Sequence, residues 1–248
     1  MQGDADVAKI GALVADPARV RILLALGDGR ALPASVLADE AGVAPSTASA
    51  HLAKLLHGRL LIAERHGRHR YFRLAGAEVG ELLEALARFS PPAEVKSLRQ
   101  GTRAHAVRQA RTCYDHLAGL VGTSLMQALL ERGLLAGGDG AFDVSSARED
   151  RFASPGFDYD YSLTERGYSE LEAFGIDFVA LRGRQRPLIR YCVDWSEQRH
   201  HLAGALGAAL TDRIFALGWA SRAARGRAVK LSAEGERGLR ETFGLALT

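Results

Sequence analysis

The sequence has few cysteines and no long apolar run. The two cysteines among its 248 residues do not make a disulfide framework, and in a reducing compartment they are expected to be free thiols. No stretch approaches the roughly 20 apolar residues that span a bilayer, and the N-terminus has no basic segment followed by an apolar one. We therefore expect a cytoplasmic protein that does not bind a membrane.

Motifs of common catalytic and nucleotide-binding sites are also missing. The sequence contains no G-x-S-x-G, no H-E-x-x-H, no Walker-type loop, and no G-x-G-x-x-G between a strand and a helix. The glycine-rich run at 137–140 lacks the lysine of a phosphate-binding loop. A nucleophile pair of Cys113 and His116 is conceivable, but no oxyanion motif accompanies it. We predict that the protein is not an enzyme.

Basic and acidic residues almost balance in number, so the chain as a whole is not strongly attracted to nucleic acid. The net charge is only +3, with a pI near 9.0. A hydrophobic content of 47% and a charged content of 25% are typical of a folded soluble protein, and a chain of 248 residues can form two domains. Any basic surface must then be local, which favours sequence-specific DNA binding over bulk coating of nucleic acid.

The most informative stretch is APSTASAHLAKLLHGRLL, at residues 44–61. Pro45 occupies a first helical position, and leucines then recur at helical spacing opposite small, polar and basic residues. A shorter amphipathic helix at 33–41 precedes it, joined through a turn at Gly42. Two helices linked by a tight glycine-containing turn form the helix-turn-helix pattern, in which the second helix reads DNA bases.

An arginine-rich hairpin is predicted directly after this helix. Residues 60–63 and 71–74 have strand character and flank a turn centred on Gly67. The cations around the turn are suited to contact phosphates and displace condensed counterions: Arg65, His66, Arg68, His69 and Arg70. A recognition helix followed by a basic wing predicts a winged helix.

Further helices are predicted at 7–15, 18–26 and 78–89, from apolar periodicity and from Asp-Pro and Pro-Pro punctuation. The predicted fold class is α+β, mainly α. It comprises a winged helix-turn-helix domain at 1–92, a linker at 93–99 and a C-terminal domain at 100–248.

Several motifs, in this order, resemble the ArsR-type transcriptional regulators. The run LVADPARVRIL at 13–23 is similar to the family's L-x-D-P-x-R-x-x-I-L opening, STASAHLAKL at 46–55 to its recognition helix, and GRHRYFRL at 67–74 to its wing. The resemblance implies a homodimer on double-stranded operator DNA, with the first and last helices of the domain at the subunit contact. It also implies control by a ligand.

The sequence departs from the metal-sensing members of that family. Residues 36–41 contain no Cys-x-Cys, and residues 78–89 contain no Asp-x-His pair. Without thiolate or imidazole ligands at these places, neither familiar metal site can be assembled. Metal sensing of the usual kind is therefore not expected.

The predicted recognition helix and wing indicate which residues are expected to contact DNA. Base contacts are predicted from the recognition helix: Ser46, Thr47, Ser49, His51 and Lys54. Backbone contacts are predicted from the wing: Arg65, Arg68, His69 and Arg70. The basic segment at 99–111 either forms a solvated helix face or adds phosphate contacts.

The C-terminal domain contains an internal repeat. HLAGLVG at 116–122 recurs as HLAGALG at 201–207, and L-T-E-R-G has a counterpart in L-S-A-E-G. We expect two units of helix, strand and helix, at about 111–176 and 190–245. The first unit carries an insertion at 137–161.

A cysteine, a carboxylate and a histidine belong to each repeat. If the repeats face each other, these side chains could converge: Cys113, Asp115, His116, Cys192, Asp194 and His201. They could hold zinc or another transition metal, act as a thiol switch, or line a pocket for an organic ligand. Alternatively, the cysteines are small buried hydrophobes, the aspartates cap the following helices, and the histidines satisfy local hydrogen bonds.

We therefore expect a sequence-specific DNA-binding transcriptional regulator, a homodimeric repressor controlled by an effector at its C-terminal domain. Its partners are then operator DNA, a second copy of the chain and a small-molecule effector. The alternative is a non-enzymatic winged-helix interaction protein that binds protein or RNA.

Overall fold

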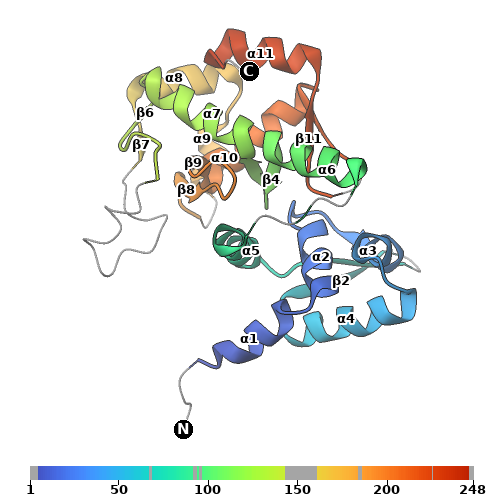
Figure 1. Cartoon of the computed structure of the whole chain (residues 1–248). Helices are drawn as coiled ribbons and strands as arrows, with labels where there is room; N and C mark the ends of the chain where they lie inside the picture. The colour runs from blue at the N-terminus through green and yellow to red at the C-terminus, as the bar shows by residue number, and fades with distance from the viewer. Residues whose placement is uncertain are drawn as a thin grey trace. The chain divides into compact units, whose positions relative to one another are not determined.

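The computed structural model describes residues 5–66, 69–91, 94, 97–142, 161–183, 186–224 and 226–245. They belong to two compact units, drawn in Figure 1. The N-terminal unit comprises Met1–Leu83 and Ala224–Arg227, and the C-terminal unit comprises Glu84–Ala223 and Ala228–Thr248. The division falls earlier than the boundary predicted after residue 92, inside the helix expected at 78–89.

The N-terminal unit has the element order of a winged helix. Its helices and strands are α1 (Val7–Val14), α2 (Pro17–Ala25), β1 (Leu32–Pro33), α3 (Ala34–Ala41), α4 (Pro45–His57), β2 (Leu61–His66), β3 (His69–Leu74) and the first half of α5 (Ala77–Phe89). The strands form one antiparallel sheet in the order β1-β3-β2. The predicted order of helices, recognition helix, wing and helix is confirmed; only the two-residue strand β1 was not predicted.

The apolar faces of α2, α3 and α4 meet in a core. The side chains of Ile22, Leu23, Leu37, Leu52 and Leu55 are at most 2% exposed. These positions repeat at helical spacing, so each helix buries one stripe and leaves the opposite one in solvent. The core thereby fixes which face of α4 is presented outward.

The Asp-Pro-x-Arg motif joins α1 to α2. Asp16 is the N-cap of α2, and its Oδ1 accepts hydrogen bonds from the backbone N–H groups of Ala18 and Arg19. Pro17 takes the first helical position, where its missing N–H costs nothing. The Arg19 guanidinium donates to the carbonyls of Leu13 and Ala12, which satisfies the C-terminal end of α1.

The C-terminal unit is built from short hairpins and longer helices. Its elements are α6 (Leu98–Gln109), β4 (Arg111–Cys113), β5 (His116–Ala118), α7 (Gly119–Glu131), β6 (Leu135–Ala136), β7 (Ser162–Leu163), α8 (Glu165–Phe174), α9 (Phe178–Arg182), β8 (Arg190–Val193), β9 (His200–Ala203), α10 (Gly204–Ala216), β10 (Ala220–Arg222), β11 (Val229–Leu231) and α11 (Ala233–Phe243). The strands pair as β4-β5, β6-β7, β8-β9 and β10-β11. From β4 to α8, and again from β8 to α11, the chain runs hairpin, helix, hairpin, helix.

This order corrects the predicted helix, strand and helix of each repeat. The His-Leu-Ala segments are strands, β5 and the end of β9, and the helices begin only at Gly119 and Gly204. Both glycines have positive φ, 75° and 78°, a conformation that glycine adopts without strain. Asp115 and Asp194 lie in the turns of hairpins, so they do not cap the following helices as one interpretation supposed.

The two halves of the C-terminal unit pack against each other through these helices and hairpins. Helix α7 contacts β9, and α10 contacts β5. The Thr211 hydroxyl on α10 accepts a hydrogen bond from Leu117 N on β5 and donates to Gly207 O in its own helix. In the part of the chain that the structure describes, none of the helices is long and apolar enough to cross a membrane.

Candidate DNA-binding face and cysteine–histidine cluster

The outer face of α4 carries the polar residues predicted to read bases. Ser46, Thr47, Ser49 and Lys54 are exposed, whereas Ala48 on the inner face is fully buried. The Ser49 hydroxyl donates to the Pro45 carbonyl, and its oxygen can still accept a further hydrogen bond. The face is therefore small, polar and basic, as a helix that enters a major groove requires.

The start of α4 is held by a glycine turn and has no side-chain cap. Gly42 has φ 68°, and Arg21 donates to the Ala41 carbonyl at the end of α3. The N-cap residue of α4, Ala44, offers no side-chain hydrogen bond. The first N–H groups of α4 therefore lack a side-chain acceptor from their N-cap, and such a helix start favours a nearby anion.

His51 differs from the other predicted base contacts. Its side chain is only 14% exposed, and its Nδ1 lies 4.0 Å from Asp16 Oδ2. Because Asp16 already caps α2, this contact lies between α4 and the start of α2. The structure therefore places His51 between helices, and not on the face that carries Ser46 and Lys54.

The wing places two arginines directly opposite each other. Arg65 on β2 pairs with Arg70 on β3, and both side chains are exposed. Like charges at directly opposite positions are destabilising, unless an anion lies beside them. Arg68 lies outside the described residues, and so does the side chain of His69.

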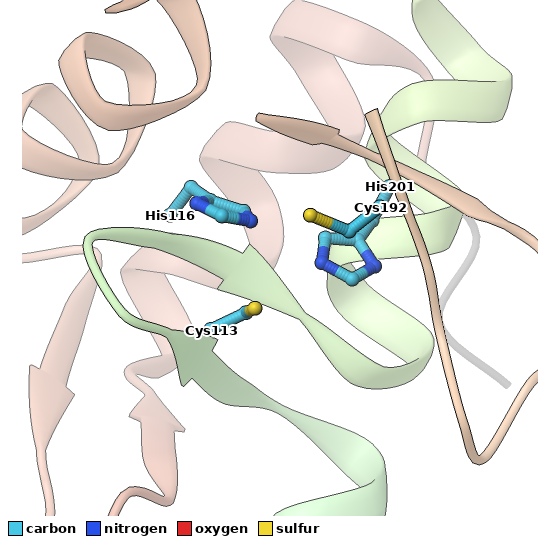
Figure 2. Close-up of side chains that lie close together, drawn as sticks. All are labelled: Cys113, His116, Cys192 and His201. Atoms are coloured by element: carbon cyan, nitrogen blue, oxygen red, sulfur yellow. The ribbon is translucent and has the colours of Figure 1, made fainter. Parts of the chain in front are cut away.

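In the C-terminal unit, a cysteine and a histidine stand opposite each other in each of two hairpins. Cys113 pairs with His116 across β4-β5, and Cys192 pairs with His201 across β8-β9. Directly opposite residues in an antiparallel ladder project to the same face. Figure 2 shows the four side chains pointing toward one another, and their candidate ligand atoms all lie within 4.8 Å of one another. We call these four residues the Cys/His cluster.

The cluster is almost fully buried. Cys113 is 2% exposed, His116 5% and His201 0%, while Cys192 is half-buried. The two imidazole rings lie with their centroids 5.2 Å apart. Among the described residues, His116 Nε2 and both ring nitrogens of His201 have no hydrogen-bond partner.

Each histidine has a carboxylate beside its Nδ1 atom. Asp115 Oδ1 lies 3.2 Å from His116 Nδ1, in hydrogen-bond contact. Asp194 Oδ2 lies 3.4 Å from His201 Nδ1, without hydrogen-bond alignment. Both aspartates of the repeat therefore lie beside the Nδ1 atoms of the histidines. The two repeats together bring two cysteines, two histidines and two aspartates close to one another.

Burial and mutual contact shift the pKa values in and around the cluster. A hydrogen bond with the Cys192 thiol, together with burial, raises the pKa of Cys113 to about 12. Burial lowers the pKa of His116, but the neighbouring Cys113 and Asp115 outweigh it and raise the pKa to about 9. Burial raises the pKa of Asp194, yet Arg111 and His201 hold it well below its usual range. The carboxylate thus stays ionised beside its histidine.

Arg111 was predicted on a basic helix and instead lies buried in β4. Its side chain is fully buried, and its Nη2 donates to Asp194 Oδ2 at 2.9 Å and to Glu84 Oε2 at 3.2 Å. The guanidinium also lies 4.7 Å from the ring centroid of Trp195. Asp194 additionally accepts from Gly119 N at 2.7 Å, so one carboxylate connects the arginine, a helix start and the cluster.

One signal for Arg111 was present in the sequence. Both repeats contain Arg-x-Cys-x-Asp, at 111–115 and 190–194. An arginine thus stands two residues before each cysteine of the repeat, as an aspartate stands two residues after it. No sequence motif marks Glu84 as buried, because an acidic residue on an amphipathic helix is normally predicted to lie on the solvent-exposed face.

Comparisons with known proteins extend over both units. A family described as a helix-turn-helix domain matches residues 14–63. YdfF of Bacillus subtilis, an uncharacterised HTH-type transcriptional regulator, is 40% identical over 231 residues, which cover 93% of this chain and 94% of YdfF. The chain belongs to the ArsR-type winged helix-turn-helix transcriptional regulators. As such a regulator, it has a DNA-binding domain in its N-terminal unit, and its relationship to YdfF includes the C-terminal unit.

Two further similarities cover about a third of the chain. The HTH-type transcriptional regulator Rv0324 of Mycobacterium tuberculosis is 40% identical over 77 residues, covering 31% of this chain and 33% of Rv0324. The homodimeric winged helix-turn-helix DNA-binding domain of Mb0332 from Mycobacterium bovis is 33% identical, with a TM-score of 0.31. It covers 36% of this chain and 88% of that domain.

Proposed function

We propose that this regulator is a homodimeric repressor that reads a double-stranded operator through α4 and grips the backbone with its wing. The observation that carries the proposal is the exposed face of α4, where Ser46, Thr47, Ser49 and Lys54 lie opposite the buried stripe. Hydroxyls and an amine of this kind match the donors and acceptors of base edges in the major groove.

The wing would supply the contacts that carry no sequence information. A phosphate beside the Arg65 and Arg70 pair would offset the repulsion between two opposed cations, and counterion release would add salt-dependent affinity. Arg68 and His69 stay predicted members of this contact. The exposed side of α6, which includes Arg108, would form a solvated face or a further phosphate contact.

Replacing Thr47 and Ser49 by alanine should weaken operator binding at least about tenfold, because each lost base contact costs about 1–3 kcal/mol of discrimination. Affinity for random DNA should change little. The measurement is a pair of mobility-shift titrations at one salt concentration, on the upstream DNA of the chain's own gene and on a scrambled duplex.

The matched control is Thr102→Ala on α6. Thr102 is exposed and donates to Leu98 O, as Ser49 donates to Pro45 O. Equal losses on operator and scrambled DNA would remove base reading from α4. Binding to RNA or to a protein, with none to any DNA, would favour the alternative of an interaction protein.

The homodimer is supported by apolar residues that the monomer leaves uncovered. Helix α1 has the sequence VAKIGALV and contains no buried residue, and its Val7 is 73% exposed. At the end of α5, Phe89 is 88% exposed. Exposed apolar residues on the first and last helices of a winged helix domain fit the subunit contact that the resemblance implies.

Introducing glutamate at Val7 and Phe89 together should convert the dimer into a monomer, because both charges would be buried in the contact. Light scattering at micromolar concentration measures this directly, and operator affinity should fall with it, since one half-site then binds alone. Val179→Glu is the control, because Val179 is 79% exposed on α9 of the C-terminal unit. A wild-type chain that is already monomeric would contradict the proposal.

The C-terminal unit would contain the effector site, and it would have arisen by duplication of one half. Both halves have the same order of hairpins and helices, and each contributes one cysteine and one histidine to the Cys/His cluster. We assign this unit no catalytic step. A regulator of this kind would act on DNA in the cytoplasm.

A further inference from the structure

We propose that the Cys/His cluster binds one transition metal ion of the zinc class, in a closed tetrahedral site that joins the two halves of the C-terminal unit. The four ligands are Cys113, His116, Cys192 and His201. The proposal concerns the C-terminal unit alone and does not depend on how the protein contacts DNA.

The distances between the ligand atoms are close to those of such a site. In a tetrahedron with Zn–S near 2.3 Å and Zn–N near 2.0–2.1 Å, ligand atoms lie about 3.3–3.8 Å apart. The four candidate atoms already lie within 4.8 Å of one another. Contraction by roughly an ångström would complete the site, and it needs no change in strand pairing.

The donor set selects the kind of metal. Two thiolates and two imidazoles are soft or borderline ligands, which suit zinc and exclude magnesium and calcium. Two thiolates also balance the charge of a divalent cation. A neutral complex is what a buried position such as that of His201, 0% exposed, can accommodate.

The histidines have the surroundings of metal ligands. His116 Nδ1 is hydrogen-bonded to Asp115 Oδ1, and Asp194 Oδ2 lies 3.4 Å from His201 Nδ1, while Nε2 of each ring has no hydrogen-bond partner among the described residues. A carboxylate behind a histidine fixes the ring orientation and makes the free nitrogen more basic, and this arrangement is usual around zinc. Asp115 is therefore a positioning residue for His116, and Asp194 places a negative charge 3.4 Å from His201 Nδ1.

Two other interpretations of the cluster explain less. If the cysteines were only small core residues, the buried nitrogens of His116 and His201 would stay unsatisfied for no gain. A disulfide between Cys113 and Cys192 would explain the thiols but leave both imidazoles unexplained. A metal ion accounts for all four side chains at once.

The ion would act as a cross-link between segments that are distant in sequence. Cys113 and His116 come from β4 and β5, whereas Cys192 and His201 come from β8 and β9. Each hairpin supplies only two ligands, so neither half can complete the site alone. Binding should therefore stabilise the contact between the halves.

The test begins with full-length protein purified from zinc-supplemented cells under reducing conditions. Elemental analysis should find about one zinc per chain. After the zinc is removed with a chelator, added Co²⁺ should give the intense visible absorption of a tetrahedral complex and a thiolate-to-cobalt charge-transfer band. Restoring Zn²⁺ should abolish both signals and raise the melting temperature of the chelated protein.

Substitutions test whether the bound zinc and the Co²⁺ spectrum come from the Cys/His cluster. Cys192→Ser and His201→Gln should each lose most of the bound zinc and the Co²⁺ spectrum. His105→Gln, at an exposed histidine of α6, should retain both. His201→Cys keeps four ligands, so it should still bind metal, with a stronger charge-transfer band from a third thiolate; this variant remains informative if the others fail to fold.

Three results would overturn the proposal. One is reduced, folded protein that takes up less than about a tenth of an equivalent of Zn²⁺ or Co²⁺. Another is an octahedral Co²⁺ spectrum, which excludes this donor set. The third is a Cys113–Cys192 disulfide in the purified protein, with no metal uptake after reduction. None of these measurements involves DNA, so they leave the proposed reading of the operator untouched.

Discussion

Replacing Arg111 by methionine should lower the free energy of unfolding of the C-terminal unit by about 3–5 kcal/mol, the usual cost of removing one partner from a buried ion pair. The guanidinium is fully buried and holds two carboxylates, Glu84 and Asp194, that are almost as inaccessible. Methionine fills much of the volume but neutralises neither acid. The cost therefore comes mainly from stranded charge, not from lost packing.

The measurement is urea denaturation followed by tryptophan fluorescence. Both tryptophans, Trp195 and Trp219, lie in the C-terminal unit, so their signal reports on that unit alone. Arg132→Met is the matched control, because Arg132 pairs with Glu170 at about one-third exposure of both side chains. A partly exposed pair of this kind contributes about 0–1 kcal/mol. Equal losses in the two variants would show that Arg111 is not held as the structure indicates.

A second variant separates charge from packing. Adding Glu84→Gln to Arg111→Met removes one of the stranded carboxylates, and part of the lost stability should return. In a double-mutant cycle, the two changes should therefore be clearly non-additive, as expected for residues in direct contact. Additive losses would mean that Glu84 and Arg111 stabilise the unit independently.

The N-terminal unit could be predicted from the sequence because its signals are local. Pro45, the glycine turn at Gly42 and the leucine stripe of α4 each act within a few residues. Asp16 and Pro17 likewise fix the start of α2 without help from distant segments. The contact of His51 with Asp16, the N-cap of α2, was not predicted, because helical spacing gives only a direction around α4.

The C-terminal unit was harder to predict because its strands are short. Three residues of β4 and three of β5 show no measurable alternation, so His116-Leu117-Ala118 was assigned to the following helix. The repeat predicted which residue types recur, since both copies carry a cysteine, an aspartate and a histidine. Their convergence depends on pairing across β4-β5 and β8-β9, and on contact between hairpins far apart in sequence.

The position of Arg111 could not be predicted from its neighbours in the sequence either. Charged residues at near-helical spacing normally indicate a solvated face, and α6 is indeed a helix. The helix ends at Gln109, two residues before Arg111, and the chain then enters a buried strand. Nothing local marks this change, because the partners that allow the charge to be buried lie at Glu84 and Asp194.

The glycines that bring the two halves together should tolerate no side chain. A Cβ at Gly122 of α7 would lie 2.4 Å from Leu117 O and 3.6 Å from His201 Cβ. A Cβ at Gly207 of α10 would lie 2.5 Å from Leu202 O and 3.3 Å from His116 Cβ. Each helix thus packs directly on the backbone of the strand that precedes it, and the Cβ of a Cys/His-cluster histidine from the other half lies beside the same glycine.

We expect Gly122→Ala and Gly207→Ala each to destabilise the C-terminal unit by about 1–3 kcal/mol, the usual cost of overpacking. This is a net loss, although alanine in a helix is favoured over glycine by up to about 1 kcal/mol. The backbone oxygens in contact belong to strands that carry His116 and His201, so the cluster should widen and its affinity for Zn²⁺ should fall as well. Urea denaturation and a competition titration with a zinc chelator measure the two effects.

Gly183→Ala provides the matched control in the same unit. Gly183 ends α9 with an ordinary φ of −76°, and its nearest neighbour, Ala180 O, lies 3.7 Å from the position of an added Cβ. This change should stay within about 0.5 kcal/mol of wild type and leave zinc affinity unchanged. If Gly207→Ala were equally silent, the halves would have to be packed more loosely than the structure shows, and the two hairpins would then not be held close enough to share one metal ion.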